Sequence, residues 1–250
     1  MTTKDGYTDL IRDKRVALVG PAKYMENTQW GREIDDHDVV VRINRGIESI
    51  ETFGDSIGTR TDILYSCLIE KAQQTGVLVP QILANEYKIK WIVAPPHSDM
   101  KGRAGRTRFH DMVNIKKVRE IEKLIPVDIV DHVFHTSLAG KVVCKPNTGF
   151  MAIYDLLRHN PTTLSVYGFS FYLDGFITGQ KSGVEREKNC TEQEFADMAF
   201  NSKRHVQKNM WEYAKTTLLG SDVVRPDPVL RKILDLQDFS RKEFERKMSE

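Results

Sequence analysis

The chain has 250 residues, of which 40% are hydrophobic and 29% charged, and its formal net charge is +2 at pH 7. These values predict one soluble globular domain with a sizeable core. They give no electrostatic reason to expect a nucleic-acid partner. No run of about 20 apolar residues predicts a membrane span, and the polar N-terminus lacks the apolar core of a secretory signal. The three cysteines, Cys67, Cys144 and Cys190, have no metal-ligand spacing and fit a reducing compartment, so we expect a cytoplasmic protein.

Strands and helices are predicted to alternate along the chain. Strands are expected at 16–19, 38–43, 61–65, 90–94, 127–133, 163–169 and 222–225, and helices at 114–124, 148–159 and 191–219. A capping box, Thr191-x-x-Glu194, predicts the start of the longest helix. This alternation indicates an α/β fold: a single-domain Rossmann-like sandwich with a mainly parallel central sheet, spanning residues 1–250 and ending in a helical tail at 229–250.

The first chemically informative segment surrounds two short strands near the N-terminus. The first strand ends at Gly20-Pro21, and the second delivers Arg42 and Asn44 to its end. Polar groups at the carboxyl ends of strands in an open sheet lie where such folds bind ligands. Arg42 is interpreted as a structural ion-pair partner rather than a ligand, whereas Asn44 fits either a turn residue or a ligand.

The second informative segment is Pro146-Asn147-Thr148-Gly149, followed by an apolar helix and a strand that ends at Gly168. Asn147 and Thr148 suit a helix N-cap, and Gly149 allows backbone N–H groups to approach a ligand closely. The partial positive charge of a helix N-terminus suits a phosphate. Plain capping explains the same residues equally well.

The two segments resemble the large and small sialylmotifs of glycosyltransferase family 29, the eukaryotic-type sialyltransferases. The large motif corresponds to a donor half at 14–65 and the small motif to residues 144–170, together roughly a third of the chain. The resemblance implies a GT-A-like variant of the fold and a CMP-sugar donor. The animal enzymes carry a membrane anchor and join the motifs by a disulfide, whose positions here fall on Val16 or Ala17 and near Asn160-Pro161. A bacterial or viral cytosolic member is therefore expected.

The resemblance also implies which residues bind the donor nucleotide: Gly20, Asn44, Asn147, Thr148, Gly149, Gly168 and Tyr172. Two departures from the family pattern stand out. Pro21 replaces an asparagine, so the backbone around Gly20 or the side chain of Lys23 would have to substitute. The histidine of the family's third motif has no match, which leaves Tyr172 as the candidate that helps the leaving phosphate.

Sugar transfer to a hydroxyl needs a general base, and histidine suits this role near neutral pH. The family's C-terminal His-x4-Glu motif supplies that base, and His205 is the histidine that falls there. The next acid, Glu212, follows at a longer spacing, and both residues are expected on the helix at 191–219. A lone helical histidine is commonly a surface residue, so His132, His135 or His97 at the edge of the sheet remain alternatives.

Two further segments have compositions that suggest metal or anion binding. Asp36-His37-Asp38 has the form of a D-x-D metal motif, but it directly precedes an apolar strand, where carboxylates fix turns. Because the family it resembles needs no metal, neither a metal nor a cofactor is expected. The segment 97–110 contains Lys101, Arg103, Arg106 and Arg108. It fits a solvated loop or a lid over an anionic substrate, and it has few aromatics for stacking on nucleic acid.

The resulting hypothesis is an inverting, metal-independent glycosyltransferase. It would move a sialic-acid-type sugar from a CMP-activated donor to a hydroxyl of a glycan or glycolipid. A CMP-Kdo or other CMP-keto-sugar transferase is the alternative within this class. A non-catalytic nucleotide-binding α/β protein is the alternative from another class. A methyltransferase is disfavoured because Gly20-Pro21-Ala22-Lys23 is not a G-x-G-x-x-G turn. The sequence leaves the acceptor and the oligomeric state open.

Overall fold

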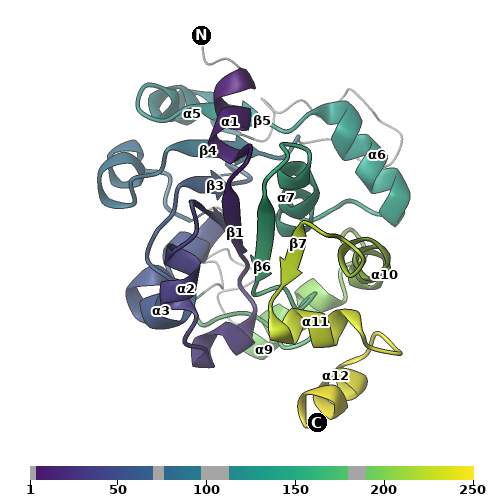
Figure 1. The fold of residues 1–250 in the computed structure, drawn as a ribbon. Coiled ribbons are helices and arrows are strands. Elements are labelled where there is room, and N and C mark those ends of the chain that lie inside the picture. The colour runs from purple at the N-terminus through teal and green to yellow at the C-terminus, as the bar shows by residue number, and fades with distance from the viewer. Residues whose placement is uncertain (1–3, 70–75, 97–112, 180–189) are drawn as a thin grey trace.

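A computed structural model describes residues 4–69, 76–96, 113–179 and 190–250 (Figure 1). Its centre is a seven-stranded sheet of order β5-β4-β3-β2-β1-β6-β7, in which every strand pair is parallel. The strands are β1 (Arg15–Val19), β2 (Val39–Ile43), β3 (Ile63–Tyr65), β4 (Trp91–Ala94), β5 (Val127–Ile129), β6 (Thr163–Tyr167) and β7 (Val224–Pro226). The predicted α/β fold with a mainly parallel sheet is confirmed, whereas the proposed internal division of the chain stays a prediction.

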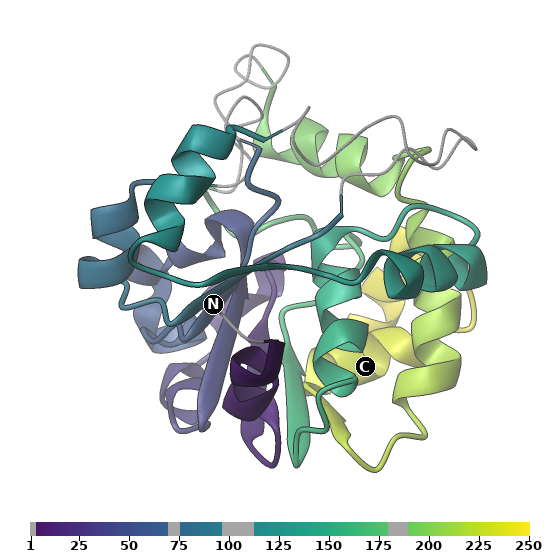
Figure 2. The same ribbon diagram turned by 90° about the horizontal axis from the view of Figure 1, so that it is seen from above.

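Helices cover both faces of the sheet, as Figure 2 shows from above. Alternate residues of β1 divide between the two faces: Val16 and Leu18 pack into one apolar cluster, and Ala17 and Val19 pack into another. Burial on both faces explains why β2 is apolar at nearly every position.

The helices sort by the cluster to which they contribute. The first face carries α1 (Lys4–Ile11), α6 (His132–Val142), α7 (Thr148–Leu157), α10 (Gln207–Leu218), α11 (Pro228–Leu234) and α12 (Arg241–Met248). The opposite face carries η1 (Lys23–Asn27), α2 (Gly31–Asp35), α3 (Ile50–Ile57), η4 (Ile82–Glu86) and α5 (Ile115–Glu122). The remaining elements are η2 (Asn44–Ile47) and α9 (Glu192–Phe200). None of the helices in the described ranges has the length and apolar character needed to cross a bilayer.

The longest predicted helix is in fact two helices. The capping box at Thr191 is confirmed, but α9 ends at Phe200 and α10 begins only at Gln207. In the connecting loop, the side chain of Asn201 donates to the carbonyl of Asp197, and the backbone N–H of His205 donates to Ser202 Oγ at 3.1 Å. These local hydrogen bonds replace helical ones, so the expectation that His205 lies on a helix is wrong.

Two other boundaries differ from the prediction. The strand expected at 127–133 ends at Ile129, because the carboxylate of Asp131 accepts the N–H of Phe134 at 2.8 Å and caps α6. His132 and His135 therefore lie on a helix and not at the end of a strand. The charged tail forms two helices, capped by the side chains of Asp227 and Ser240.

Candidate active site

A cleft of about 500 Å³ lies at the carboxyl ends of the central strands. The residues expected to bind a ligand or act as base meet there: Asn44, Asn147, Thr148, Gly149, Gly168, Tyr172 and His205 all line it. They come from the ends of β2 and β6, from the start of α7 and from the loop between α9 and α10. Segments far apart in the sequence thus converge at the edge of the sheet where open α/β folds bind ligands.

The start of α7 presents free backbone donors to this cleft. Asn147 is the N-cap, and its Oδ1 accepts the N–H of Phe150 at 2.8 Å. Its carbonyl accepts the N–H of Met151 at 3.0 Å. The N–H groups of Thr148 and Gly149 then have no acceptor among the described residues, as is usual in a first helical turn. Together with the helix dipole, they form a site suited to an anion.

Asn44 lines the cleft at the end of β2. It adopts a left-handed backbone conformation with φ = 47°, which asparagine tolerates better than most residues. Its Oδ1 accepts the N–H of Cys67 at 3.0 Å, which fixes the orientation of the amide. The Nδ2 group has no partner among the described residues and is available to donate to a ligand.

The three glycines of the predicted site serve close packing. A Cβ on Gly20 would lie 2.4 Å from the carbonyl oxygen of Gly168, and Gly20 does not itself line the cleft. Gly168 has φ = 72° and approaches Gly20 just as closely. A Cβ on Gly149 would lie 2.9 Å from the Phe169 ring and 3.0 Å from Ile43. The missing side chain at Gly149 therefore serves internal packing, and its role in ligand access stays a prediction.

We expect Gly20→Ala to lower the free energy of unfolding by about 1–3 kcal/mol, the usual cost of overpacking. The new methyl group would push against the backbone of Gly168, so the ends of β1 and β6 would have to separate. A matched control is Gly140→Ala on α6, where a Cβ meets nothing within 4 Å and helix propensity favours alanine. Denaturant unfolding compares the two, and equal stability of both variants would contradict the close approach of the two backbones.

His205 is fixed as a neutral imidazole. Its Nδ1 lies 2.7 Å from the carbonyl oxygen of Lys145. Because a carbonyl can only accept, Nδ1 carries the proton and Nε2 is left as an acceptor. Burial lowers the pKa of His205 to about 4, so the ring is neutral at pH 7. The amide of Gln207 donates to the His205 carbonyl at 2.7 Å and holds the loop in place.

The alternative bases are less favourably placed. His132 is exposed on α6 and His135 is buried beneath that helix, and neither lines the cleft. His97 lies outside the described residues, as do His110 and the other residues of the basic segment 97–110. His37 is held by Ser165 and by the carbonyl of Glu33, as expected of a structural histidine.

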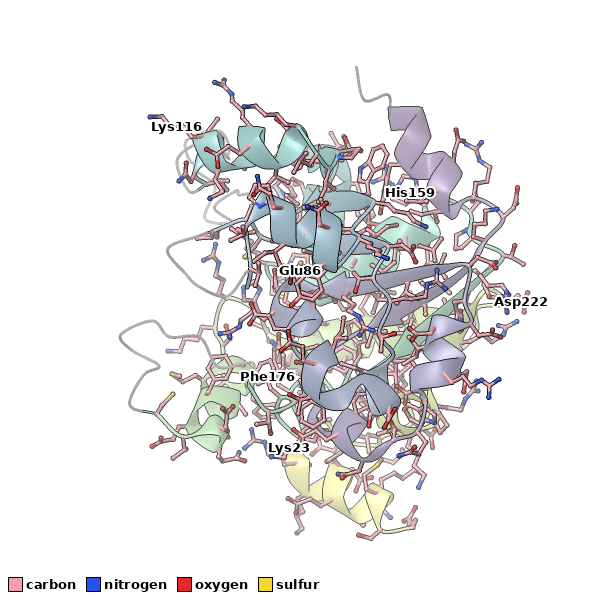
Figure 3. The ribbon with its side chains drawn as sticks, turned by 90° about the vertical axis from the view of Figure 1, so that its left-hand side faces the viewer. Lys23, Glu86, Lys116, His159, Phe176 and Asp222 are labelled. Atoms are coloured by element: carbon pink, nitrogen blue, oxygen red, sulfur yellow. The ribbon has the colours of Figure 1, made fainter. Side chains whose placement is uncertain are left out.

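Tyr172 presents a hydroxyl to the cleft near the α7 N-terminus. Its Oη accepts a long hydrogen bond from Asn147 Nδ2 at 3.4 Å, so its own proton is available for donation. Burial raises the pKa of Tyr172 to about 12, which keeps this proton in place at neutral pH. The centroid of the Tyr172 ring lies 4.6 Å from that of Phe176. The Phe176 ring in turn stacks on Phe195 of α9, with 4.9 Å between their centroids. Figure 3 shows Phe176 beside this helix.

The acidic segment before β2 lies at the other end of the sheet. Asp38 accepts the backbone N–H of Arg15 at 2.8 Å, and Asp35 accepts the N–H groups of Thr59 and Arg60. These carboxylates fix turns at the amino ends of β1 and β2, away from the cleft. No cluster of metal-ligating side chains was found within the described ranges.

Arg42 has a structural role, but its partners differ from those expected. It is buried and donates to the carbonyls of Ile57, Gly58 and Arg60 and to Thr61 Oγ1, rather than to a carboxylate. It thereby anchors the segment between α3 and β3 to the end of β2. Lys23, considered as a substitute contact beside Pro21, is exposed and does not line the cleft.

Several lining residues escaped the sequence analysis. They are two cations, Lys145 and Arg204, two polar residues, Ser202 and Gln207, and an apolar group of Phe176, Phe195 and Met198. Lys145 directly precedes the Pro146-Asn147-Thr148-Gly149 segment, and this adjacency was the only signal for it. Phe176 lies in the segment after β6. The other five residues lie in the 191–219 stretch that the sequence pattern merged into one long helix.

A protein-family model described as glycosyltransferase family 29 (sialyltransferase) matches residues 8–175. The chain is 24% identical over 163 residues to the CMP-N-acetylneuraminate-beta-galactosamide-alpha-2,3-sialyltransferase 1 of Sus scrofa, across 64% of this chain and 45% of that protein. The chain thus matches less than half the length of this curated relative.

Solved structures of sialyltransferases share the fold. A monofunctional alpha-2,3-sialyltransferase from Campylobacter jejuni aligns with a TM-score of 0.56 and 14% identity, over 90% of this chain and 77% of that one. A mammalian sialyltransferase in complex with Gal-beta-1-3GalNAc-ortho-nitrophenol aligns with a TM-score of 0.51 and 16% identity, over 88% and 71%. The expected GT-A-like variant of the Rossmann-like fold is confirmed by this likeness.

Proposed function

Because the chain belongs to glycosyltransferase family 29, the sialyltransferases, we propose that it moves a sialic-acid-type sugar from a CMP-activated donor to a hydroxyl of a glycan or glycolipid. The observation that carries this proposal is the cleft. It joins an anion-binding helix N-terminus, a hydroxyl donor and a neutral histidine base. The name of the pig relative supports CMP-N-acetylneuraminate as the donor.

The donor would bind with its phosphate at the start of α7. The N–H groups of Thr148 and Gly149 point to this position, and the Tyr172 hydroxyl can add a third hydrogen bond. Asn44 Nδ2 would contact the nucleotide from the end of β2. These fixed donors would stabilise the negative charge on the departing CMP.

Transfer would proceed with inversion at the anomeric carbon. The acceptor hydroxyl attacks this carbon and gives its proton to His205 Nε2, while the bond from carbon to the phosphate oxygen breaks and CMP leaves with the electron pair. A single displacement of this kind needs the base and the leaving group on opposite sides of the sugar. His205 on the α9–α10 loop and the α7 N-terminus both line the cleft, and the sugar would have to bind between them. We further propose that no metal ion takes part, since protein donors face the phosphate position.

A nucleotide panel tests the donor assignment directly. We expect CMP to raise the melting temperature of the protein, because a ligand at 100 times its Kd adds about 2.7 kcal/mol to the free energy of unfolding. UMP and GMP at the same concentration should add far less. Equal stabilisation by all three nucleotides, or by none, would contradict the proposal. Binding of CMP without hydrolysis or transfer of a CMP-sugar would favour a non-catalytic nucleotide-binding protein.

A further inference from the structure

A buried lysine lines the cleft beside the start of α7. Lys145 is only 8% exposed, although lysine is rarely buried in folded proteins. It immediately precedes Pro146 and the helix cap Asn147. Among the described residues that line the cleft there is no aspartate or glutamate, so the charges there are those of Lys145 and of Arg204 at the exposed rim.

Hydrogen bonds join the backbone of Lys145 to the α9–α10 loop, which carries His205. Its N–H donates to the carbonyl of Arg204 at 3.1 Å, and its own carbonyl accepts Nδ1–H of His205 at 2.7 Å. Cys144 Sγ adds a weak contact to the carbonyl of Val206 at 3.8 Å. The segment that begins the helix and the loop that carries the base are therefore joined at Lys145.

The charge of Lys145 affects the pKa values of two residues that line the cleft. Burial mainly raises the pKa of Cys67, near the end of β3, and the Lys145 ammonium partly opposes this rise. Burial mainly lowers the pKa of His205, and the same ammonium adds to that fall. The ammonium thus lies near enough to Cys67 and His205, which both line the cleft, to affect their pKa values.

We propose that the Lys145 ammonium contacts the phosphate of the CMP donor and stabilises its charge as CMP departs, which makes Lys145 a further catalytic residue. The inference rests on the proposed function. When the bond from the anomeric carbon to the phosphate oxygen breaks, its electron pair stays on that oxygen and the phosphate gains one negative charge. The proton of the acceptor hydroxyl goes to His205 and so does not neutralise the phosphate.

The Lys145 ammonium carries a full positive charge, whereas the helix terminus carries only part of one. The N-terminus of a helix carries only about half an elementary charge, whereas the departing phosphate gains a whole one. A cation in a site with little water stabilises that charge more strongly than one at the surface. Lys145 would thus take the role that a divalent cation has in metal-dependent glycosyltransferases.

The test compares the affinities of CMP and cytidine, which differ only in the phosphate, by isothermal titration calorimetry. We expect Lys145→Met to weaken CMP binding about tenfold or more, the scale of a lost charge-assisted hydrogen bond, and to leave cytidine binding nearly unchanged. Turnover of a CMP-sugar should fall about 10²-fold or more. Lys145→Arg should retain most of the preference for CMP over cytidine. Lys141→Met, an exposed lysine of α6 outside the cleft, is the matched control.

The outcomes separate the inference from the proposed function. Unchanged CMP affinity in Lys145→Met, or equal losses for CMP and cytidine, would overturn the phosphate contact and leave Lys145 a structural residue. If Lys145→Met fails to fold, Lys145→Gln provides the same comparison with a neutral polar side chain. Absence of CMP binding in the unmodified protein would instead show that the proposed function is wrong.

Discussion

Replacing His205 by glutamine is expected to lower the turnover of CMP-sugar by about 10²–10⁴-fold, the range measured for loss of a general base. Glutamine keeps a side-chain amide that can donate to the carbonyl of Lys145, so the loop should stay in place. It cannot accept a proton near neutral pH, and the acceptor hydroxyl would have to attack without a base. Steady-state assays at saturating donor, with CMP affinity measured in parallel, separate a loss in turnover from a loss in binding.

The matched controls are His132→Gln and His135→Gln on α6. Turnover near that of the unmodified protein is expected for His132→Gln, because this side chain is exposed outside the cleft. Collapse of activity in either control, with little effect of His205→Gln, would move the acceptor site to α6.

The pH profile gives a second readout of the same base. An ordinary histidine would cause kcat/KM to fall as the pH drops through about 6.5. Burial lowers the pKa of His205 to about 4, so the base should stay unprotonated down to about that pH. The decrease in kcat/KM should therefore begin only near pH 4.

Removing the hydroxyl of Tyr172 is expected to reduce turnover about 10²-fold, the usual effect of losing one donor to a developing oxyanion. Tyr172→Phe keeps the ring, so its packing against Phe176 should persist. The variant loses the proton available to the departing phosphate and also the oxygen that accepts the long hydrogen bond from Asn147 Nδ2 at 3.4 Å. The rate of CMP release at saturating donor measures this effect, and CMP affinity should change much less than turnover.

Tyr154→Phe is the control for Tyr172→Phe. Tyr154 is a partly buried tyrosine of α7 whose hydroxyl bonds to Thr217 Oγ1 at 2.6 Å, outside the cleft. It should leave turnover almost unchanged. Similar turnover in both variants would show that Tyr172 does not assist the leaving group and that the role of the family's third-motif histidine is filled elsewhere.

Local patterns sufficed for much of the fold. The strand Val39–Ile43 is a β-branched run buried on both faces, and its sequence indicates a strand wherever it lies in the sheet. The cap at Asn147 and the capping box at Thr191 depend on residues only three positions apart, so they too were predictable.

The features that escaped prediction depend on contacts between distant segments. The break between α9 and α10 is held by the hydrogen bond from the Lys145 N–H to the Arg204 carbonyl, across 59 positions of sequence. Periodicity alone cannot show such a contact. The burial of Lys145 has the same origin, and the close approach of Gly20 to Gly168 requires β1 and β6 to be neighbours in the sheet.

One reaction can show whether this cleft transfers a sugar from CMP with inversion and without a metal. CMP-N-acetylneuraminate and a β-galactoside are incubated with the protein in excess EDTA, and the product is followed by NMR at the anomeric centre. We predict a new glycoside whose anomeric configuration is opposite to that of the donor, at a rate that EDTA does not change. A product with retained configuration, or activity that EDTA abolishes and manganese restores, would show that the proposed mechanism is wrong.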